Sequence, residues 1–220
     1  MKPVSEKNNF LYLTVSIILL LFVGAISDQY YELAGQHLVQ AFSVATIIVG
    51  IYGFRLTQKW LHTGIGIAAS VVASVILGIT LELLQLYYLH LILLFCFYLW
   101  AIWLAGKQVL FSGVIDANSI VGAICIYMLT GLLWALMYLL IAQAIPGAFN
   151  GIDQSVWHEN FADIAYYSYV TLTTLGYGDI SPVAPIARFL VYMEAVVGVF
   201  YMAILVASLI GVRIRESQKN

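Results

Sequence analysis

Charged side chains are scarce in this sequence, and their scarcity excludes a soluble domain. Only 9% of the 220 residues are charged and 63% are hydrophobic, whereas a soluble domain carries roughly a quarter charged residues. The 9 basic and 11 acidic residues form no basic patch that could neutralise a row of phosphates, so we expect no nucleic-acid partner. The two cysteines, Cys96 and Cys125, lie inside apolar runs, where we expect neither a disulfide nor a metal site. The composition therefore indicates a chain that lies in membrane lipid.

Long apolar runs make up most of the chain, and their lengths predict six membrane-spanning helices. A helix needs about 20 residues to cross a hydrocarbon layer of ~30 Å. The first run, 10–27, is interpreted as a retained helix because no small-x-small cleavage site and polar domain follow it. The run 63–105 is too long for one crossing, so we expect a tight turn between about Leu81 and Leu89. The other spans are predicted at 38–56, 119–145 and 185–212.

The basic residues predict the orientation, because Lys and Arg in short loops stay on the cytoplasmic side of a membrane. With six spans and a cytoplasmic N-terminus, Arg188 lies outside and the other eight of the 9 basic residues lie inside. A chain with five spans would place the three C-terminal basic residues outside as well. We therefore expect a multi-pass protein of the plasma membrane with both termini in the cytoplasm. The cytoplasmic segments are predicted to be an N-terminus at 1–9, a linker at 106–118 and a short tail at 213–220.

The segment between the last two predicted spans has an unusual pattern. Residues Phe161 to Leu172 are apolar and aromatic but too few to cross, which predicts a re-entrant half-helix. After it, Gly176 and Gly178 alternate with bulkier residues. Alternating right-handed and left-handed conformations let consecutive backbone carbonyls point the same way, and glycine adopts the left-handed one without a Cβ penalty. Such carbonyls can replace the water around potassium without adding a full charge that would trap the ion.

This loop is therefore predicted to bind potassium ions as a selectivity filter. The filter residues are Thr174, Leu175, Gly176, Tyr177 and Gly178, and we expect potassium at the first four. The Thr174 hydroxyl can add an oxygen at the inner end, and Tyr177 is expected to brace the filter against the half-helix. The negative C-terminal end of that half-helix would favour a cation nearby. Potassium is expected as the permeant ion, and no cofactor is expected.

Residues Thr174 to Asp179 read Thr-Leu-Gly-Tyr-Gly-Asp, which resembles the T-V-G-Y-G filter of the potassium channel family with Leu in place of Val. The resemblance extends from about Asn118 to Gly211. It implies an all-α membrane protein, with six transmembrane helices plus a re-entrant pore helix and filter loop. One chain carries one such loop, so the resemblance also implies a homotetramer, with three identical subunits and membrane lipid as partners. The implied pore domain is 119–212, with an outer helix at 119–145, a pore helix at about 161–173, the filter at 174–178 and an inner helix at 185–212.

Several residues around the filter depart from well-studied members of that family. Val170 stands where those members carry a Glu that bonds the Asp after the filter, and Tyr166 and Tyr167 stand at the positions of a Trp pair. Loss of the acid removes that brace on Asp179, so the family's filter inactivation does not carry over. The two tyrosines either support the outer wall of the filter or are interfacial aromatics. Thr173, Asp179 and Val170 are also expected to support the filter.

Two residues of the last span are candidates for gating. Gly198 lies mid-span, where the family often has a hinge glycine, or it marks a close contact between helices. Glu194 lies one turn earlier, and an ionisable group inside a bilayer should have a partner. We expect it either to be held against the pore helix near Thr171 or Tyr167, or to face the cavity and titrate.

The first four predicted helices, in 10–105, equal in number the sensor domain of six-helix channels but lack its charges. A voltage sensor needs several arginines in its fourth helix, each worth about 2.3 kcal/mol per 100 mV. Residues 86–105 contain none. We therefore expect a domain that packs against the pore, and no steep voltage gating.

Two other functions stay open on the sequence. The chain could be a nonselective or regulatory subunit that needs another pore-forming partner, or it could be a membrane enzyme. The possible acids and bases Asp163, Asp179, Glu194 and His158 show no metal-ligand spacing or nucleophile motif, so an enzyme is not expected. The main prediction is passive, potassium-selective conduction.

Overall fold

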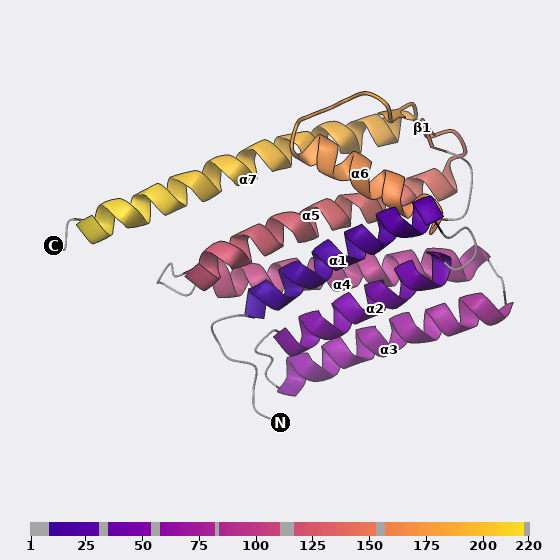
Figure 1. Cartoon of the computed structure of the whole chain (residues 1–220), viewed down its shortest axis with the longest axis horizontal. Helices are drawn as coiled ribbons and strands as arrows, with labels where there is room; N and C mark the ends of the chain where they lie inside the picture. Colours follow the sequence, from indigo (N-terminus) through magenta and orange to yellow (C-terminus); the bar gives the residue numbers. More distant parts are fainter. Residues whose placement is uncertain are drawn as a thin grey trace.

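The computed structural model is mostly helical and describes residues 9–30, 35–53, 58–81, 84–110, 117–152 and 157–217. Figure 1 shows the helices running side by side, with α5 between the N-terminal helices and the pair formed by α6 and α7. In chain order the elements are α1 (Asn9–Tyr30), α2 (Gly35–Gly53), α3 (Gln58–Leu81), α4 (Leu84–Leu110), α5 (Ala117–Ala144), β1 (Phe149–Asn150), α6 (Phe161–Leu172), β2 (Ser181–Pro182) and α7 (Pro185–Ser217).

Four of the described helices are long and apolar enough to cross a membrane. They are α1, α4, α5 and α7, and shorter apolar stretches lie in α2 at Leu38–Gly53 and in α3 at His62–Gly78. Large apolar side chains also cover the outside of the bundle, for example Phe22 and Ile76, each more than half exposed. Such a surface is unfavourable in water and suited to lipid. The chain is therefore a membrane protein.

Two predictions need correction, and one boundary can be given more closely. The tight turn expected between about Leu81 and Leu89 falls at the start of that range, because α3 ends at Leu81 and α4 is helical from Leu84. The polar residue His90 does not interrupt α4, because its buried side chain has a partner on α3: His90 Nδ1 lies 3.0 Å from Ser74 Oγ. The linker expected from Gly106 begins later, because α4 continues to Leu110. The fold is also not purely helical, because β1 pairs antiparallel with β2.

Some predictions fall outside the described residues. They concern most of the N-terminus, at 1–8, the turn residues 82–83, most of the linker, at 111–116, and the end of the tail, at 218–220.

The N-terminal helices pack on the C-terminal part of the same chain. The Tyr88 hydroxyl of α4 donates to the Gln143 carbonyl of α5 at 2.7 Å. Gly24 of α1 lies against the ring of Phe161, the first residue of α6, and a Cβ on that glycine would be 3.1 Å from the ring. Helices α1 and α4 therefore hold α5, and α1 also contacts the beginning of α6.

The strand pair joins the two ends of the segment that contains α6. Phe149 lies opposite Pro182 and Asn150 opposite Ser181, so the chain leaves α5 and returns to α7 at one place. From there α7 runs back along α6, and its C-terminal half extends beyond the other helices (Figure 1).

Candidate ion-conduction site

Helix α6 packs along α5, where side-chain hydroxyls of α6 form hydrogen bonds with backbone carbonyls of α5. The buried Ser168 hydroxyl lies 2.7 Å from the Gly131 carbonyl oxygen, and the Tyr169 hydroxyl donates to the Met128 carbonyl at 2.7 Å. Gly131 allows this approach, because a Cβ there would lie 2.5 Å from the Tyr169 ring. A mid-span glycine is typical of a close helix contact, and this signal in the sequence could have identified Gly131 as part of the site.

The C-terminal end of α6 is held by both α5 and α7. The Tyr127 hydroxyl of α5 donates to the Leu172 carbonyl at 3.1 Å. On the other side, a Cβ on Gly198 of α7 would lie 2.1 Å from the same carbonyl oxygen. Gly198 is thus a close contact between α7 and α6, one of the two interpretations left open by the sequence. Thr173 caps this end, with its hydroxyl donating to the Tyr169 carbonyl at 2.6 Å.

The backbone that follows α6 alternates in handedness. Thr174, Gly176 and Gly178 have φ angles of 61°, 57° and 83°, whereas Leu175 and Tyr177 between them do not have positive φ. Among the described residues, Thr174 is the only non-glycine residue with positive φ. This conformation costs an L-residue about 1–2 kcal/mol, and local strain of this kind is concentrated at functional sites. The alternation agrees with the backbone that the two glycines predict.

The loop is attached to α6 through its N–H groups. The amide of Thr174 donates to the Thr171 carbonyl at 2.9 Å, and the amide of Leu175 donates to the Val170 carbonyl at 2.9 Å. The amide of Gly176 donates to that same carbonyl at 3.4 Å. Val170 therefore supports the loop with its backbone while its side chain is buried. These bonds occupy amides and leave the loop's carbonyl oxygens available for a ligand.

Residues 173–179 lie on the surface of the single chain. The side chains of Leu175 and Tyr177 are prominent there, with 60% and 69% of their surface exposed. The predicted brace of Tyr177 on its own α6 is therefore not formed within one chain. The C-terminal end of α6 lies directly before this loop, so the negative end of its dipole is next to the loop's carbonyls.

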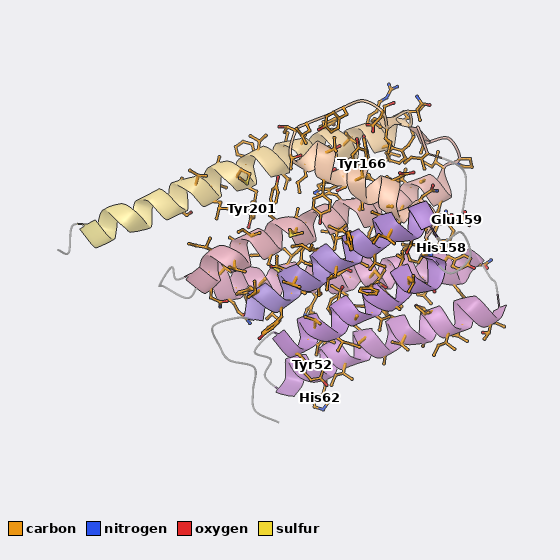
Figure 2. All side chains as sticks on the ribbon, in the orientation of Figure 1. Tyr52, His62, His158, Glu159, Tyr166 and Tyr201 are labelled. Carbon is orange, nitrogen blue, oxygen red and sulfur yellow. The ribbon has the colours of Figure 1, made fainter. Side chains whose placement is uncertain are left out.

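Tyr166 supports the outer end of the loop. Its hydroxyl donates to a carboxylate oxygen of Asp179 at 2.7 Å, and Figure 2 shows Tyr166 extending from α6. This hydrogen bond holds the pKa of the Asp179 carboxyl below its ordinary value. Gly151, which sequence reasoning missed, contacts the other side of Asp179: with φ of 81°, a Cβ there would lie 2.4 Å from the Asp179 carbonyl oxygen.

Tyr167 has a different environment from Tyr166. Its side chain is buried, and its ring lies 5.5 Å from the Tyr138 ring and 5.7 Å from the Phe149 ring, centroid to centroid. Of the two tyrosines, Tyr166 reaches the outer end of the loop, and Tyr167 packs between α6, α5 and β1.

Glu194 is fully buried against α6, which is one of the two arrangements expected from the sequence. Its partner there is Ser168, the residue after Tyr167: Oε1 lies 2.6 Å from the Ser168 hydroxyl, and Oε2 accepts from the Tyr138 hydroxyl at 2.5 Å. Because the chain's own helices bury it, Glu194 does not face an open cavity. Sequence reasoning missed Tyr138, since spacing along α5 does not say which of its residues face α7.

Of the residues considered for an enzyme site, Glu194 lies between three helices and Asp179 lies at the outer end of the loop. Among the described residues, no group of three or more His, Cys, Asp or Glu side chains could hold a metal ion. His158 packs by its ring against Tyr87 and Trp157. Figure 2 places it with Glu159 at the end of α6 away from the loop.

Comparison with known proteins identifies the class of this domain. Residues 123–214 match the family model described as an ion channel. Over 88 residues the chain is 36% identical to the inward rectifier potassium channel Kirbac3.1 of Paramagnetospirillum magnetotacticum. This match covers 40% of the present chain and 27% of that relative. The match thus spans about a quarter of the relative's length, and no solved structure gives a significant match. The chain contains an ion-channel domain. Both comparisons support the assignment to the potassium channel family that the filter motif predicts.

Proposed function

We propose that the chain is one subunit of a homotetrameric, potassium-selective channel that conducts potassium passively across the plasma membrane. The observation that carries this proposal is the alternation of left-handed backbone at Thr174, Gly176 and Gly178, in an exposed loop attached to α6 by its amides. Such a backbone lets successive carbonyls point the same way, which is the geometry that coordinates a dehydrated cation. Potassium would bind to the carbonyls of Thr174 through Tyr177 and to the Thr174 hydroxyl.

Several copies of the chain are needed to surround the ion, and the resemblance to potassium channels implies four. One exposed strand offers oxygens from one side, and a dehydrated potassium ion needs them from all sides. The exposed apolar residues Tyr192, Val199 and Phe200 of α7 would then pack against neighbouring copies. The exposed ring of Tyr177 would find its brace on a neighbour as well.

In the proposed assembly all six long helices cross the membrane, including α2 and α3, with both termini in the cytoplasm. Lipid would cover the apolar outer surface, and the pore would need no cofactor. Because 86–105 contains no arginine, α4 would move little charge, so we propose that the channel is not steeply gated by voltage. A channel of this kind catalyses no chemical reaction.

The test is the potassium-to-sodium permeability ratio of the purified chain in liposomes. We expect a strong preference for potassium in the wild type. Gly176→Ala places a Cβ at φ of 57°, which costs about 1–2 kcal/mol in a left-handed conformation, and should abolish the preference. Gly106→Ala is the matched control, because Gly106 has an ordinary helical φ and equally open surroundings.

The flux results distinguish a potassium-selective channel from a nonselective or regulatory subunit. Potassium selectivity that is lost in Gly176→Ala and kept in Gly106→Ala supports the filter. Equal permeability to sodium, or no flux from the chain alone, contradicts the proposal and favours a nonselective or regulatory subunit.

A further inference from the structure

The three helices that meet at Glu194 form a chain of short hydrogen bonds. Glu194, on α7, has none of its surface exposed, and neither has Ser168 on α6. Tyr138 of α5 lies 2.5 Å from Oε2 of Glu194, and the Ser168 hydroxyl lies 2.6 Å from Oε1. The same Ser168 hydroxyl lies 2.7 Å from the Gly131 carbonyl oxygen of α5. All three distances are those of O–H···O hydrogen bonds, and each such bond needs its own proton.

Counting protons determines the charge on the carboxyl group. The Gly131 carbonyl carries no proton, so Ser168 must use its single hydroxyl proton for that contact. The contact between Ser168 and Glu194 then needs a proton from Glu194. Tyr138 supplies the third proton to Oε2. Three bonds and three protons balance when Glu194 is a neutral acid that donates from Oε1, whereas an ionised Glu194 leaves one short oxygen-to-oxygen contact without a proton.

The surroundings of Glu194 agree with a neutral carboxyl. The other ionisable side chains that act on it are the tyrosines Tyr127 and Tyr138 of α5 and Tyr167 and Tyr169 of α6. Within the described residues, no basic side chain contributes to its environment. Arg188, more than one turn earlier on α7, donates instead to the Pro182 carbonyl at 3.2 Å. An ionised Glu194 would lose its water here without gaining a cation.

We infer that Glu194 is a protonated positioning residue, which ties α7 to α6 and α5 and so fixes the helix that carries the loop 174–178. The effect of Glu194 on conduction rests on the proposed channel function. The protonation of Glu194 does not depend on that function. Glu194 touches no permeant ion. It acts through Ser168, whose helix supplies the carbonyls of Val170 and Thr171 to the loop amides.

Infrared spectroscopy of the purified full chain in liposomes at neutral pH tests the protonation without any flux. We expect the carbonyl stretching band of a protonated carboxylic acid in the wild type and its loss in Glu194→Gln. Asp163→Asn is the matched control, because Asp163 is an exposed carboxyl on α6, the helix that Glu194 contacts, and its removal should leave the band unchanged. A wild type without the band, or a Glu194→Gln variant that keeps it, overturns the inference.

Potassium flux tests the positioning. In Glu194→Gln the new side-chain amide can donate to Ser168 and accept from Tyr138, so this variant should conduct within about twofold of the wild type. Glu194→Ala loses both contacts and should conduct roughly tenfold less, since two hydrogen bonds of ordinary strength correspond to at least that factor. Raising the pH should reduce flux in the wild type as Glu194 ionises, and Glu194→Gln should not follow this profile.

The outcomes separate this inference from the proposed function. A Glu194→Gln variant as impaired as Glu194→Ala, or with the wild-type response to alkaline pH, overturns the positioning role of a neutral acid. If Glu194→Ala does not assemble, two measurements on Glu194→Gln still test the inference: its infrared carboxylic-acid band and the dependence of its potassium flux on pH. A wild type that conducts no potassium contradicts the channel proposal, while the infrared band still decides the charge on Glu194.

Discussion

Replacing Gly198 by Ala distinguishes a packing contact from a hinge. A Cβ at Gly198 would lie 2.1 Å from the carbonyl oxygen of Leu172 and 3.0 Å from its carbon. Non-bonded heavy atoms favour separations of about 3.5–4.0 Å, so α7 and the end of α6 must separate by about 1 Å or more. The carbonyl is not free to turn aside, because it accepts the Tyr127 hydroxyl at 3.1 Å.

The two roles predict opposite signs for the change in stability. Overpacking of this kind costs about 1–3 kcal/mol, and Ala in a helix recovers up to about 1 kcal/mol relative to Gly. Because the clash at Gly198 is with backbone, we expect a net loss of about 1–2 kcal/mol. A glycine that served only as a hinge would make no such clash, and Ala would raise stability by about 1 kcal/mol.

The assay is the unfolding midpoint of the purified protein in detergent, measured beside potassium flux. Gly66→Ala on α3 is the matched control, because a Cβ there meets nothing within 4 Å. We expect Gly198→Ala to unfold more readily than the wild type and to conduct less, while Gly66→Ala is at least as stable as the wild type. A Gly198→Ala protein as stable as the control would refute the packing role and restore the hinge.

Two further predictions concern the outer end of the loop. Tyr166→Phe removes the hydrogen bond that lowers the pKa of Asp179. The bond is present above the ordinary pKa of Asp179 and is lost as the pH falls through its lowered pKa, so flux in Tyr166→Phe should begin to decline at a higher pH during acidification. An unchanged acid profile would show that this bond does not support the loop. Gly151→Ala sets a Cβ 2.4 Å from the Asp179 carbonyl oxygen at φ of 81°, and should lower the potassium-to-sodium permeability ratio. Wild-type selectivity in this variant would count against a role for the Gly151 contact.

Local signals in the sequence were sufficient for α6 and the loop after it. A short apolar segment between polar residues predicted α6 at Phe161–Leu172, where the structure has it. The two glycines predicted alternating handedness, because the conformational freedom of glycine depends on its own missing Cβ. Thr174 could not be predicted to share that conformation, since a β-branched residue disfavours it and the hydrogen bonds to α6 impose it.

Contacts between helices could not be predicted in the same way. Apolar residues surround α5, so the pattern that would show which of its faces is inside is absent. For this reason the partner of Glu194 was predicted on the correct helix and near Tyr167, but not as Ser168 itself. The two roles of Gly198 also could not be separated, because the same residue type serves both. The turn near Leu81 was placed too broadly, since polar residues inside a bundle can pair with each other and leave the helix intact.

The docking of α6 on α5 has a consequence for folding during synthesis of the chain. The carbonyls of Met128 and Gly131, which receive α6, precede it in the sequence, as does the Tyr127 hydroxyl that binds its end. A chain synthesised from its N-terminus can therefore dock α6 on α5 as soon as α6 emerges. Glu194 and Gly198 emerge after α6, and they then pack against a helix that is already docked on α5. Of these three helices, the one made latest is thus the one that secures the loop.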